Sequence, residues 1–260
     1  MSRKKILLSG FIILILAVFL ISVNQFYFLV KSRQILLNTF FIAEDDLIGV
    51  DISSYQGDVD MSKLKEQDIR FIYIKATEGS NHVDHRFAEN WKNARENNLP
   101  AGAYHFFSYD SSGKKQAENF IKTVGELEDC LIPVVDVEYY ADKEENPPEK
   151  EDLIRELQAY LDALEAEYDV KPMIYTRMDL YRKYLKGTFD DYKKWMSSFY
   201  YPLKWGYKDD WYIWQYLDQG QLDGLSGGIP YIDLNVLNKE KNLRSLMIPK
   251  VYHLDSGRSG

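Results

Sequence analysis

Two carboxyl side chains separated by one residue are the clearest chemical feature of the sequence. Asp136 and Glu138 end the apolar run that begins at Ile132, and such a run is typical of a strand buried on both faces. Residues two apart on a strand share a face and lie about 6.6 Å apart along it. Two carboxyls this close oppose each other's ionisation, so the pKa of one rises. Such a pair can protonate a glycosidic oxygen and stabilise the positive charge that develops, although a solvated strand end or a structural ion pair is the alternative.

Eight short apolar segments predict the strands that position these carboxyls. They cover residues 48–51, 71–75, 101–105, 132–138, 173–176, 195–198, 211–215 and 231–235. Amphipathic helical patterns separate the first five, and this alternation predicts a parallel sheet with right-handed crossovers. Eight strands indicate a closed α/β barrel. Because the last three segments have no clear helices between them, we expect an irregular eight-stranded (β/α) barrel.

In such barrels the functional side chains lie at the C-terminal ends of the strands. This rule selects a ring of polar residues on the predicted strands: Asp51, Lys75, His105, Asp136, Glu138, Gln215 and Asp233. Any one of them could simply end a strand, but turns do not easily explain a whole ring. We interpret His105 as a structural hydrogen-bonding residue, because a further acid beside Glu138 would be redundant.

Seven ordered motifs make the chain similar to a known family. They are Asp51-Ile-Ser-Ser-Tyr-Gln-Gly57, Phe71-Ile-Tyr-Ile-Lys-Ala-Thr-Glu-Gly79, Gly102-Ala-Tyr-His-Phe106, Pro133-Val-Val-Asp-Val-Glu138, Ile174-Tyr175, Trp214-Gln-Tyr216 and Ile232-Asp-Leu-Asn235. They resemble the motifs of glycoside hydrolase family 25, the lysozymes that cleave peptidoglycan, over about residues 47–238. The match is loose around Trp195, and the polar loop 141–150 departs from the family pattern.

The resemblance implies an irregular eight-stranded barrel with N-acetylmuramidase activity, which cuts the β-1,4 bond between N-acetylmuramic acid and N-acetylglucosamine. Glu138 matches the general acid of the family and Asp136 its neighbouring carboxylate. Asp51 and Asp233 match the two other acidic groups of the site. The implied mechanism is retaining, with the 2-acetamido group of the substrate as nucleophile and Asp136 orienting it.

Tyrosines and polar side chains within the same motifs are the candidate substrate-binding residues: Tyr55, Gln56, Lys75, Tyr104, Tyr175 and Gln215. The tyrosines could stack on sugar faces or bind hydroxyls, or they could be core aromatics with a bonded hydroxyl. Lys75 could bind the carboxylates or the substrate, or form a structural ion pair. Gln56 could bind substrate or hold the loop after the first strand.

The N-terminal sequence predicts a membrane anchor or a signal peptide. Three basic residues at positions 3–5 precede an uncharged run from Ile6 to Val30, and about 20 apolar residues are enough to cross a bilayer. No small-residue cleavage site follows, and the aromatic residues 26–28 suit a membrane interface. We therefore favour an uncleaved anchor at 1–30, with the rest of the chain outside, although Lys31 and Arg33 weaken the charge asymmetry. A cleaved signal peptide is the alternative and would make the protein secreted.

The remaining chain is divided into a juxtamembrane linker at 31–46, a catalytic barrel at 47–240 and a C-terminal tail at 241–260. All 40 acidic residues follow residue 40, against 27 of the 32 basic ones, so nucleic acid is not an expected partner. One cysteine, Cys130, excludes a disulfide framework and a cysteine-based metal cage. With no metal-binding histidine motif or Gly-rich phosphate loop, no cofactor is expected.

The expected partners are peptidoglycan glycan strands and the membrane. Because the chain is predicted to be anchored, an envelope-spanning protein machine is a further possible partner. A catalytically silent, membrane-anchored glycan-binding barrel is the main alternative, although the chain retains all four acids. A secreted lysin requires cleavage of the anchor. A chitinase-like specificity would not require the lactyl group of muramic acid.

Overall fold

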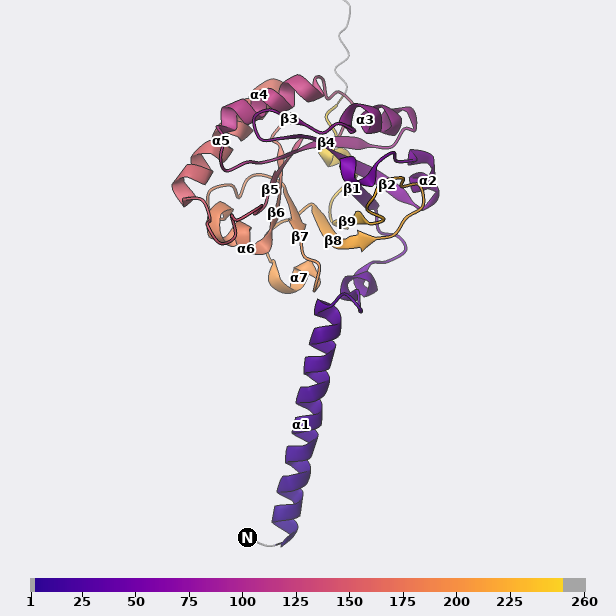
Figure 1. Ribbon diagram of the computed structural model, residues 1–260, viewed down its shortest axis with the longest axis vertical. Helices are drawn as coiled ribbons and strands as arrows, with labels where there is room; N and C mark the ends of the chain where they lie inside the picture. Colours follow the sequence, from indigo (N-terminus) through magenta and orange to yellow (C-terminus); the bar gives the residue numbers. More distant parts are fainter. Residues whose placement is uncertain (1–2, 250–260) are drawn as a thin grey trace, which may run out of the picture.

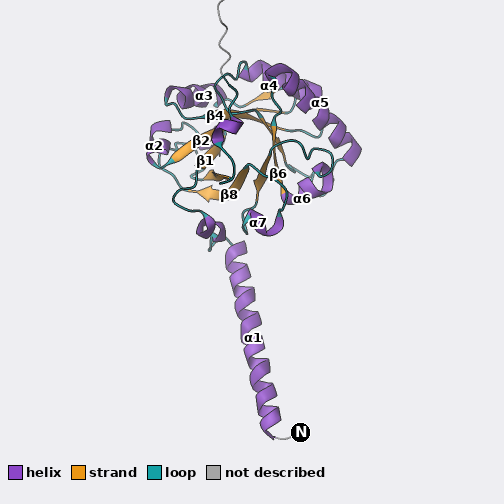
Figure 2. Cartoon of the chain, turned by 180° about the vertical axis from the view of Figure 1, so that it is seen from behind, coloured by secondary structure: helices purple, strands orange, loops and turns teal. Residues whose placement is uncertain are grey.

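Eight strands close into a barrel in the structure, a computed structural model that describes residues 3–249 (Figures 1 and 2). The strands are β1 (Ile48–Ile52), β2 (Ile69–Glu78), β4 (Ala101–Phe106), β5 (Val134–Val137), β6 (Met173–Arg177), β7 (Lys194–Ser197), β8 (Ile213–Gly220) and β9 (Ile232–Leu237). A ninth strand, β3 (His82–Val83), pairs with β2 outside the ring. Strand β1 pairs with both β2 and β9, and these two pairings close the barrel.

The last strand runs antiparallel to its neighbours, in the part of the chain where no helices were predicted between the strands. Strands β1 to β8 run parallel to their neighbours around the ring, but β9 is antiparallel to both β8 and β1. Parallel neighbours need a crossover of about a dozen residues or more, usually containing a helix. Residues 221–231, which connect β8 to β9, contain no helix. The chain therefore turns back directly, and the barrel is mixed rather than wholly parallel.

Helices cover the first half of the barrel and become short in the second half. The regular ones are α2 (Met61–Glu66), α3 (Phe87–Glu96), α4 (Gly113–Val124) and α5 (Lys150–Tyr168). After β6 come α6 (Met178–Leu180), a π-helical turn η3 (Tyr181–Leu185) and the four-residue α7 (Leu203–Gly206). This confirms the expected irregular barrel.

Strand β5 shows how the apolar pattern separates two core layers. Val135 and Val137 are fully buried in the layer beneath the helices, with Leu157 of α5. Val134 faces the interior of the barrel, where it packs with Trp195. Alternation along the strand therefore directs Asp136 toward the barrel axis, as the sequence predicts.

The segment that follows β9 belongs to the barrel. Leu246, in the 3₁₀ helix η4 (Leu243–Leu246), is fully buried, and its carbonyl accepts a 2.7 Å hydrogen bond from the Ile132 N–H. The Ile248 N–H donates to the carbonyl of Cys130 at 2.8 Å. Residues 243–248 thus cover the end of the barrel where β5 begins, because the apolar interior would otherwise be exposed there. They are therefore not part of a peripheral tail, which the sequence predicts at 241–260 and of which residues 250–260 lie outside the described residues.

One long apolar helix precedes the barrel. Helix α1 (Arg3–Lys31) contains an apolar stretch, Phe11–Lys31, in which a window of 18 residues has a mean hydropathy of 2.4 and is not buried, whereas Val30 near the end of the helix is buried against the protein. At 1.5 Å per residue this stretch is about 31 Å long, close to the thickness of a bilayer's hydrocarbon core. The helix is long and apolar enough to cross a membrane, and a signal sequence would meet the same criteria.

The segment between α1 and the barrel is docked rather than free, which corrects its description as a linker. It contains the 3₁₀ helix η1 (Leu37–Phe41). The buried Asn38 side chain donates hydrogen bonds to the carbonyls of Ser198 and Tyr216, at 2.6 and 2.9 Å. Arg33 forms an ion pair with Asp218 at 2.7 Å. Side chains in this segment satisfy polar groups of β7 and β8, so the segment is part of the folded domain.

Candidate active site

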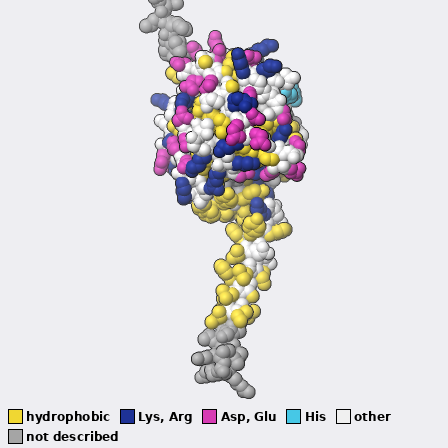
Figure 3. Space-filling model, turned by 90° about the vertical axis from the view of Figure 1, so that its left-hand side faces the viewer, with side chains coloured by type: hydrophobic (Ala, Val, Ile, Leu, Met, Phe, Trp, Pro, Cys, Tyr) yellow, Lys and Arg dark blue, Asp and Glu magenta, His cyan; other side chains and the backbone are white. Residues whose placement is uncertain are grey.

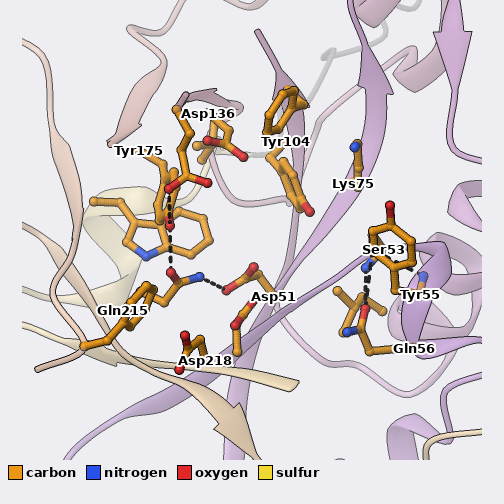
Figure 4. Close-up of a pocket in the computed structure, with 17 residues that line it drawn as sticks. Asp51, Ser53, Tyr55, Gln56, Lys75, Tyr104, Asp136, Tyr175, Gln215 and Asp218 are labelled. Atoms are coloured by element: carbon orange, nitrogen blue, oxygen red, sulfur yellow. Dashed lines mark hydrogen bonds between the residues drawn. The ribbon is translucent and has the colours of Figure 1, made fainter. Parts of the chain in front are cut away.

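A cavity of about 330 Å³ opens at the end of the barrel where the parallel strands finish (Figure 4). All ten site residues predicted from the sequence line it: Asp51, Tyr55, Gln56, Lys75, Tyr104, Asp136, Glu138, Tyr175, Gln215 and Asp233. They come from seven strands, from Glu138 directly after β5, and from the 3₁₀ turn η2 (Ser54–Gln56). Barrel closure therefore gathers residues that are up to 182 positions apart in the chain.

The two carboxyls of the Asp136-Val-Glu138 motif have few partners. Asp136 is 8% exposed, and its Oδ1 has no hydrogen-bond partner among the described residues. Burial, with the charge of Glu138, raises the pKa of Asp136 well above its ordinary value, against the opposing effect of Lys75. Burial also raises the pKa of Glu138 to about 7, although a 3.3 Å hydrogen bond from the Tyr175 hydroxyl acts in the other direction. Glu138 can therefore hold a proton at neutral pH and release it there.

Asp51, on the opposite side of the cavity, is held by a hydrogen-bond network. Its Oδ2 accepts from Gln215 Nε2 at 2.8 Å and from Asn235 Nδ2 at 2.7 Å. The single proton of the Tyr175 hydroxyl is shared between Gln215 Oε1, at 2.7 Å, and Glu138 Oε1, at 3.3 Å. Gln215 thus lies between Tyr175 and Asp51 (Figure 4). Burial raises the pKa of Asp51, and these two amide donors oppose the rise. The network connects the two sides of the cavity through Tyr175.

Asp233 faces Asp51 directly across the antiparallel pair of β1 and β9. Burial and the charge of Asp51 raise the pKa of Asp233 well above its ordinary value. A hydrogen bond between the two carboxyls lowers the pKa of Asp51 and raises that of Asp233. Asp233 therefore carries the proton and donates it to Asp51. It lies at the start of β9, and only the reversed direction of that strand brings it to the cavity.

Lys75 and Tyr104 lie on neighbouring strands beside the carboxyls. Lys75 Nζ forms an ion pair with Glu78 at 2.7 Å and lies 4.9 Å from the centroid of the Phe106 ring. Burial, helped by the charges of Asp51 and Asp136, raises the pKa of Tyr104 well above its ordinary value, so its hydroxyl stays a neutral donor. The ion pair supports the structural interpretation of Lys75, while its charge also reaches Asp136.

Tyr55 and Gln56 follow the first strand but face different surroundings. Tyr55 is 65% exposed, so its ring is available at the mouth of the cavity. Gln56 Oε1 accepts from the Ser53 N–H at 2.9 Å, and its Nε2 donates to the carbonyl of Tyr231 at 3.1 Å. Both ends of the Gln56 amide are thus bonded to main chain. This favours its role in holding the loop.

The motif glycine that follows Gln56 is required by backbone geometry. Gly57 has φ of 69°, and a Cβ there would lie 2.6 Å from the backbone nitrogen of Gly227. Glycine adopts this region at no steric cost. It allows the loop after β1 to approach the loop between β8 and β9 at the cavity mouth.

Three residues that contribute to the site were not selected from the sequence as site residues. Trp195 and Asp218 line the cavity, and Asn235 contacts it through Asp51. Asn235 bonds Asp51 and also accepts a 2.8 Å hydrogen bond from Trp195 Nε1, which belongs to the cavity floor. Asp218, on β8, lines the wall and pairs with Arg33. The spacing of Asp233 and Asn235, two residues apart on one strand, was a usable signal for Asn235. Nothing local in the sequence indicates Asp218.

His105 and Cys130 both lie away from the cavity lining. The His105 ring is bonded on one side to Thr77 Oγ1 at 2.7 Å and on the other to Gln116 Oε1 at 3.0 Å, and burial lowers its pKa to about 4. These contacts support a structural role. Cys130 is buried, which raises the pKa of its thiol. Among residues 3–249, no group of three or more His, Cys, Asp or Glu side chains could hold a metal ion.

Comparison with known proteins identifies the family of this chain. Residues 50–225 match the model of "Glycosyl hydrolases family 25". The chain belongs to glycosyl hydrolases family 25. A family 25 glycosyl hydrolase structure from Bacillus anthracis is 41% identical, with a TM-score of 0.71 over 79% of this chain and 96% of that one.

Two further proteins are similar to the chain in sequence. The uncharacterized protein YegX of Escherichia coli is 35% identical over 73% of this chain and 69% of its own length. The autolytic lysozyme of Clostridium acetobutylicum is 30% identical over 69% of this chain and 53% of its own length. Family membership makes the chain a glycoside hydrolase and the cavity its candidate active site.

Proposed function

We propose that this protein is an N-acetylmuramidase that cleaves the β-1,4 bond between N-acetylmuramic acid and N-acetylglucosamine in peptidoglycan. The observation that carries the proposal is Glu138, a carboxyl with a pKa of about 7 beside the buried Asp136, in a cavity of the family 25 barrel. The relative from Clostridium acetobutylicum, an autolytic lysozyme, supports the substrate class.

In this proposal Glu138 is the general acid. A carboxyl with a pKa near 7 is about half protonated at neutral pH, so it can protonate the leaving oxygen and later act as a base. The 3.3 Å hydrogen bond from Tyr175 steadies its Oε1 without fully compensating its charge. Removing its proton thus costs little at working pH.

Asp136 would stabilise the reacting centre. Its unpartnered Oδ1 can accept a hydrogen bond from the N–H of the substrate's 2-acetamido group. That bond would orient the acetamido oxygen toward the anomeric carbon, which favours a retaining reaction through the substrate's own nucleophile. An inverted anomeric product, detected by NMR at the first turnover, would refute this step.

Asp51 and Asp233 complete the acidic site from the other wall. The negative charge of Asp51 helps keep the pKa of Asp136 high. The positive charge that develops on the sugar would also be stabilised by Asp51, the ionised partner of the pair. Tyr55, Tyr104 and Tyr175 are the proposed sugar contacts, together with Lys75 and Gln215. Gln215 would act mainly by positioning Asp51.

We further propose that α1 is an uncleaved anchor with the barrel on the cell-wall side. Its apolar stretch is long enough to span a bilayer, and the segment that follows is built into the barrel. The intact N-terminus, found by mass spectrometry of protein from the membrane fraction, tests this. A mature chain starting near residue 30 in the culture medium would make the protein a secreted lysin instead.

The decisive activity experiment uses the full chain in detergent, because truncation at residue 44 would remove Arg33 and Asn38 from the barrel. Purified peptidoglycan is digested, and the new reducing ends are identified by mass spectrometry. We expect muropeptides that end in N-acetylmuramic acid from the natural chain and none from Glu138→Gln. Glu145→Gln, a change at an exposed glutamate in the neighbouring loop, should behave like the natural chain.

Other products would lead to other conclusions. Reducing ends of N-acetylglucosamine would keep the hydrolase but change the bond it cuts. Cleavage of chitin oligosaccharides at a similar rate would show that the lactyl group is not required. Glycan binding without any product would support the catalytically silent barrel.

A further inference from the structure

An exposed aromatic surface lies on the barrel beside the end of α1. We call it the anchor-side patch; its members are Phe40, Phe41, Tyr201 and Trp205, which are 77%, 40%, 42% and 56% exposed. The rings of Phe41 and Trp205 meet edge to face with centroids 5.4 Å apart. In both ribbon views α7 and the segment after α1 lie on the side of the barrel where α1 joins it, and Figure 3 shows apolar side chains gathered there.

The patch cannot move freely relative to α1, because the helix end is fixed to the same part of the barrel. Arg33 donates to the carbonyl of Phe199 at 3.0 Å and to Asp218 at 2.7 Å, and its side chain is only 13% exposed. Lys31 Nζ lies 4.1 Å from the centroid of the Tyr200 ring. These contacts join the last turn of α1 to the loop that carries Tyr201.

The composition of the patch suits a membrane interface. Aromatic rings with a polar edge, above all Trp and Tyr, favour the headgroup level of a bilayer. Lys204 Nζ lies 5.8 Å from the centroid of the Phe41 ring, and Lys208 follows one turn later in the chain. Cations beside an aromatic surface add attraction to anionic lipid headgroups.

The position of the patch also suits a membrane interface. Phe40 follows the end of α1 by nine residues, and the end of a membrane-spanning helix lies at the headgroup level. Exposing a contiguous apolar surface to water is unfavourable and usually marks an interaction site. The surface that would lie nearest to the patch, if α1 spans a bilayer, is that bilayer itself.

We propose that the anchor-side patch rests in the outer headgroup layer of the membrane that α1 enters and holds the barrel in one orientation. This inference rests on the proposal that α1 is an uncleaved anchor, and not on the bond that the enzyme cuts. The barrel is seen nearly end-on in Figure 1, whereas α1 runs along the length of the picture. The barrel axis therefore lies along the membrane surface, and the active site opens sideways to glycan that runs close to the membrane.

The test uses tryptophan fluorescence of the full chain in vesicles of phosphatidylcholine and phosphatidylglycerol, with or without bromine on the acyl chains. Helix α1 contains no tryptophan, so insertion of α1 alone produces no quenching. We expect brominated lipid to quench the natural chain, and Trp205→Phe to lose most of that quenching. Trp91→Phe is the matched control, because Trp91 lies on α3, away from α1 (Figure 1), and its loss should leave the quenching unchanged.

A second variant shows whether the result depends on the patch or only on the substitution at Trp205. Phe40→Ser combined with Phe41→Ser keeps all tryptophans and should reduce the quenching of Trp205. Far-ultraviolet circular dichroism and muropeptide release in detergent should match those of the natural chain. Failure of the muramidase proposal would not affect the quenching result.

Three outcomes would overturn the inference. Co-flotation of the natural chain with vesicles, without quenching, would mean that α1 inserts but the patch stays in water. Absence of co-flotation would refute the anchor and the patch together. Shielding of Trp205 from aqueous iodide only at high protein density, without lipid quenching, would show that a second copy covers the patch.

Discussion

The two walls of the active site carry the same kind of side chain in different surroundings. On the β5 wall, Asp136 has one carboxyl oxygen without a partner, and Glu138 has a single long hydrogen bond from Tyr175. On the wall formed by β1 and β9, Asp51 accepts two amide hydrogen bonds of 2.7–2.8 Å and faces the protonated Asp233. Asp136 and Asp51 are each 8% exposed, so burial alone does not distinguish the two walls.

The difference indicates how the work is divided. A buried polar atom without a partner is costly, and at a binding cavity that cost is removed when a ligand supplies the missing bond. The β5 wall therefore has unused capacity for substrate and for proton exchange. The wall of β1 and β9 has its capacity engaged in a network that holds one carboxylate in place. The predictions below test this division.

Glu138→Gln should have the largest effect. The amide cannot supply a proton to the leaving oxygen, so we expect kcat on peptidoglycan to fall about 10³-fold with KM little changed. Initial rates of reducing-end release measure this, with Glu145→Gln as the control. A loss of less than about tenfold would remove Glu138 from the role of general acid.

Asp136→Asn should have the second largest effect on turnover. It keeps the shape of the side chain but removes the charge that stabilises the reacting centre, so we expect kcat to fall about 10²-fold. Asp142→Asn, in the exposed loop after β5, serves as the matched control. Normal turnover in Asp136→Asn would show that the charge of Asp136 has no part in the reaction.

Asn235→Ala tests the wall formed by β1 and β9, and the quantity measured is the free energy of unfolding. The change removes a donor to Asp51 and the acceptor for Trp195, so the free energy of unfolding should fall by about 1–3 kcal/mol. Urea denaturation measures the change, and Asn146→Ala in an exposed loop is the control. An unchanged urea midpoint would mean that the network does not hold Asp51.

Asp233→Asn should have a small effect on turnover. Asp233 carries a proton and donates it to Asp51, and an asparagine amide can replace that donor. We expect kcat within about fivefold of the natural value, equivalent to about 1 kcal/mol. A loss as large as that of Glu138→Gln would contradict the division between the walls.

Tyr175→Phe should shift the pH profile with the smallest loss of rate. Glu138 works as an acid when protonated, so turnover should fall as the pH rises through about 7. The Tyr175 hydroxyl favours the charged form of Glu138. Its removal raises the pKa of Glu138 and should move the alkaline limb to higher pH in a kcat–pH series. A limb that moves to lower pH would contradict this assignment.

Asp233 shows how far strand-end reasoning can go. The rule that functional residues end parallel strands selected it, yet it lies near the start of β9. It reaches the active site because β9 runs against its neighbours, which places its first residues where the other strands finish. The residue was identified from the sequence, but the direction of the strand that carries it was not.

What the sequence determined by itself is local: the eight apolar segments, the inward face of Asp136, the long apolar helix and the motifs of the family. Period-two alternation and apolar run length depend on neighbours in the chain, so they can be read without the fold. The tertiary structure alone decided the direction of β9, the bonds that Asp51 receives from Gln215 and Asn235, and the docking of Arg33 on Asp218. These partners are separated by more than 160 residues, and only closure of the barrel brings them within hydrogen-bonding distance.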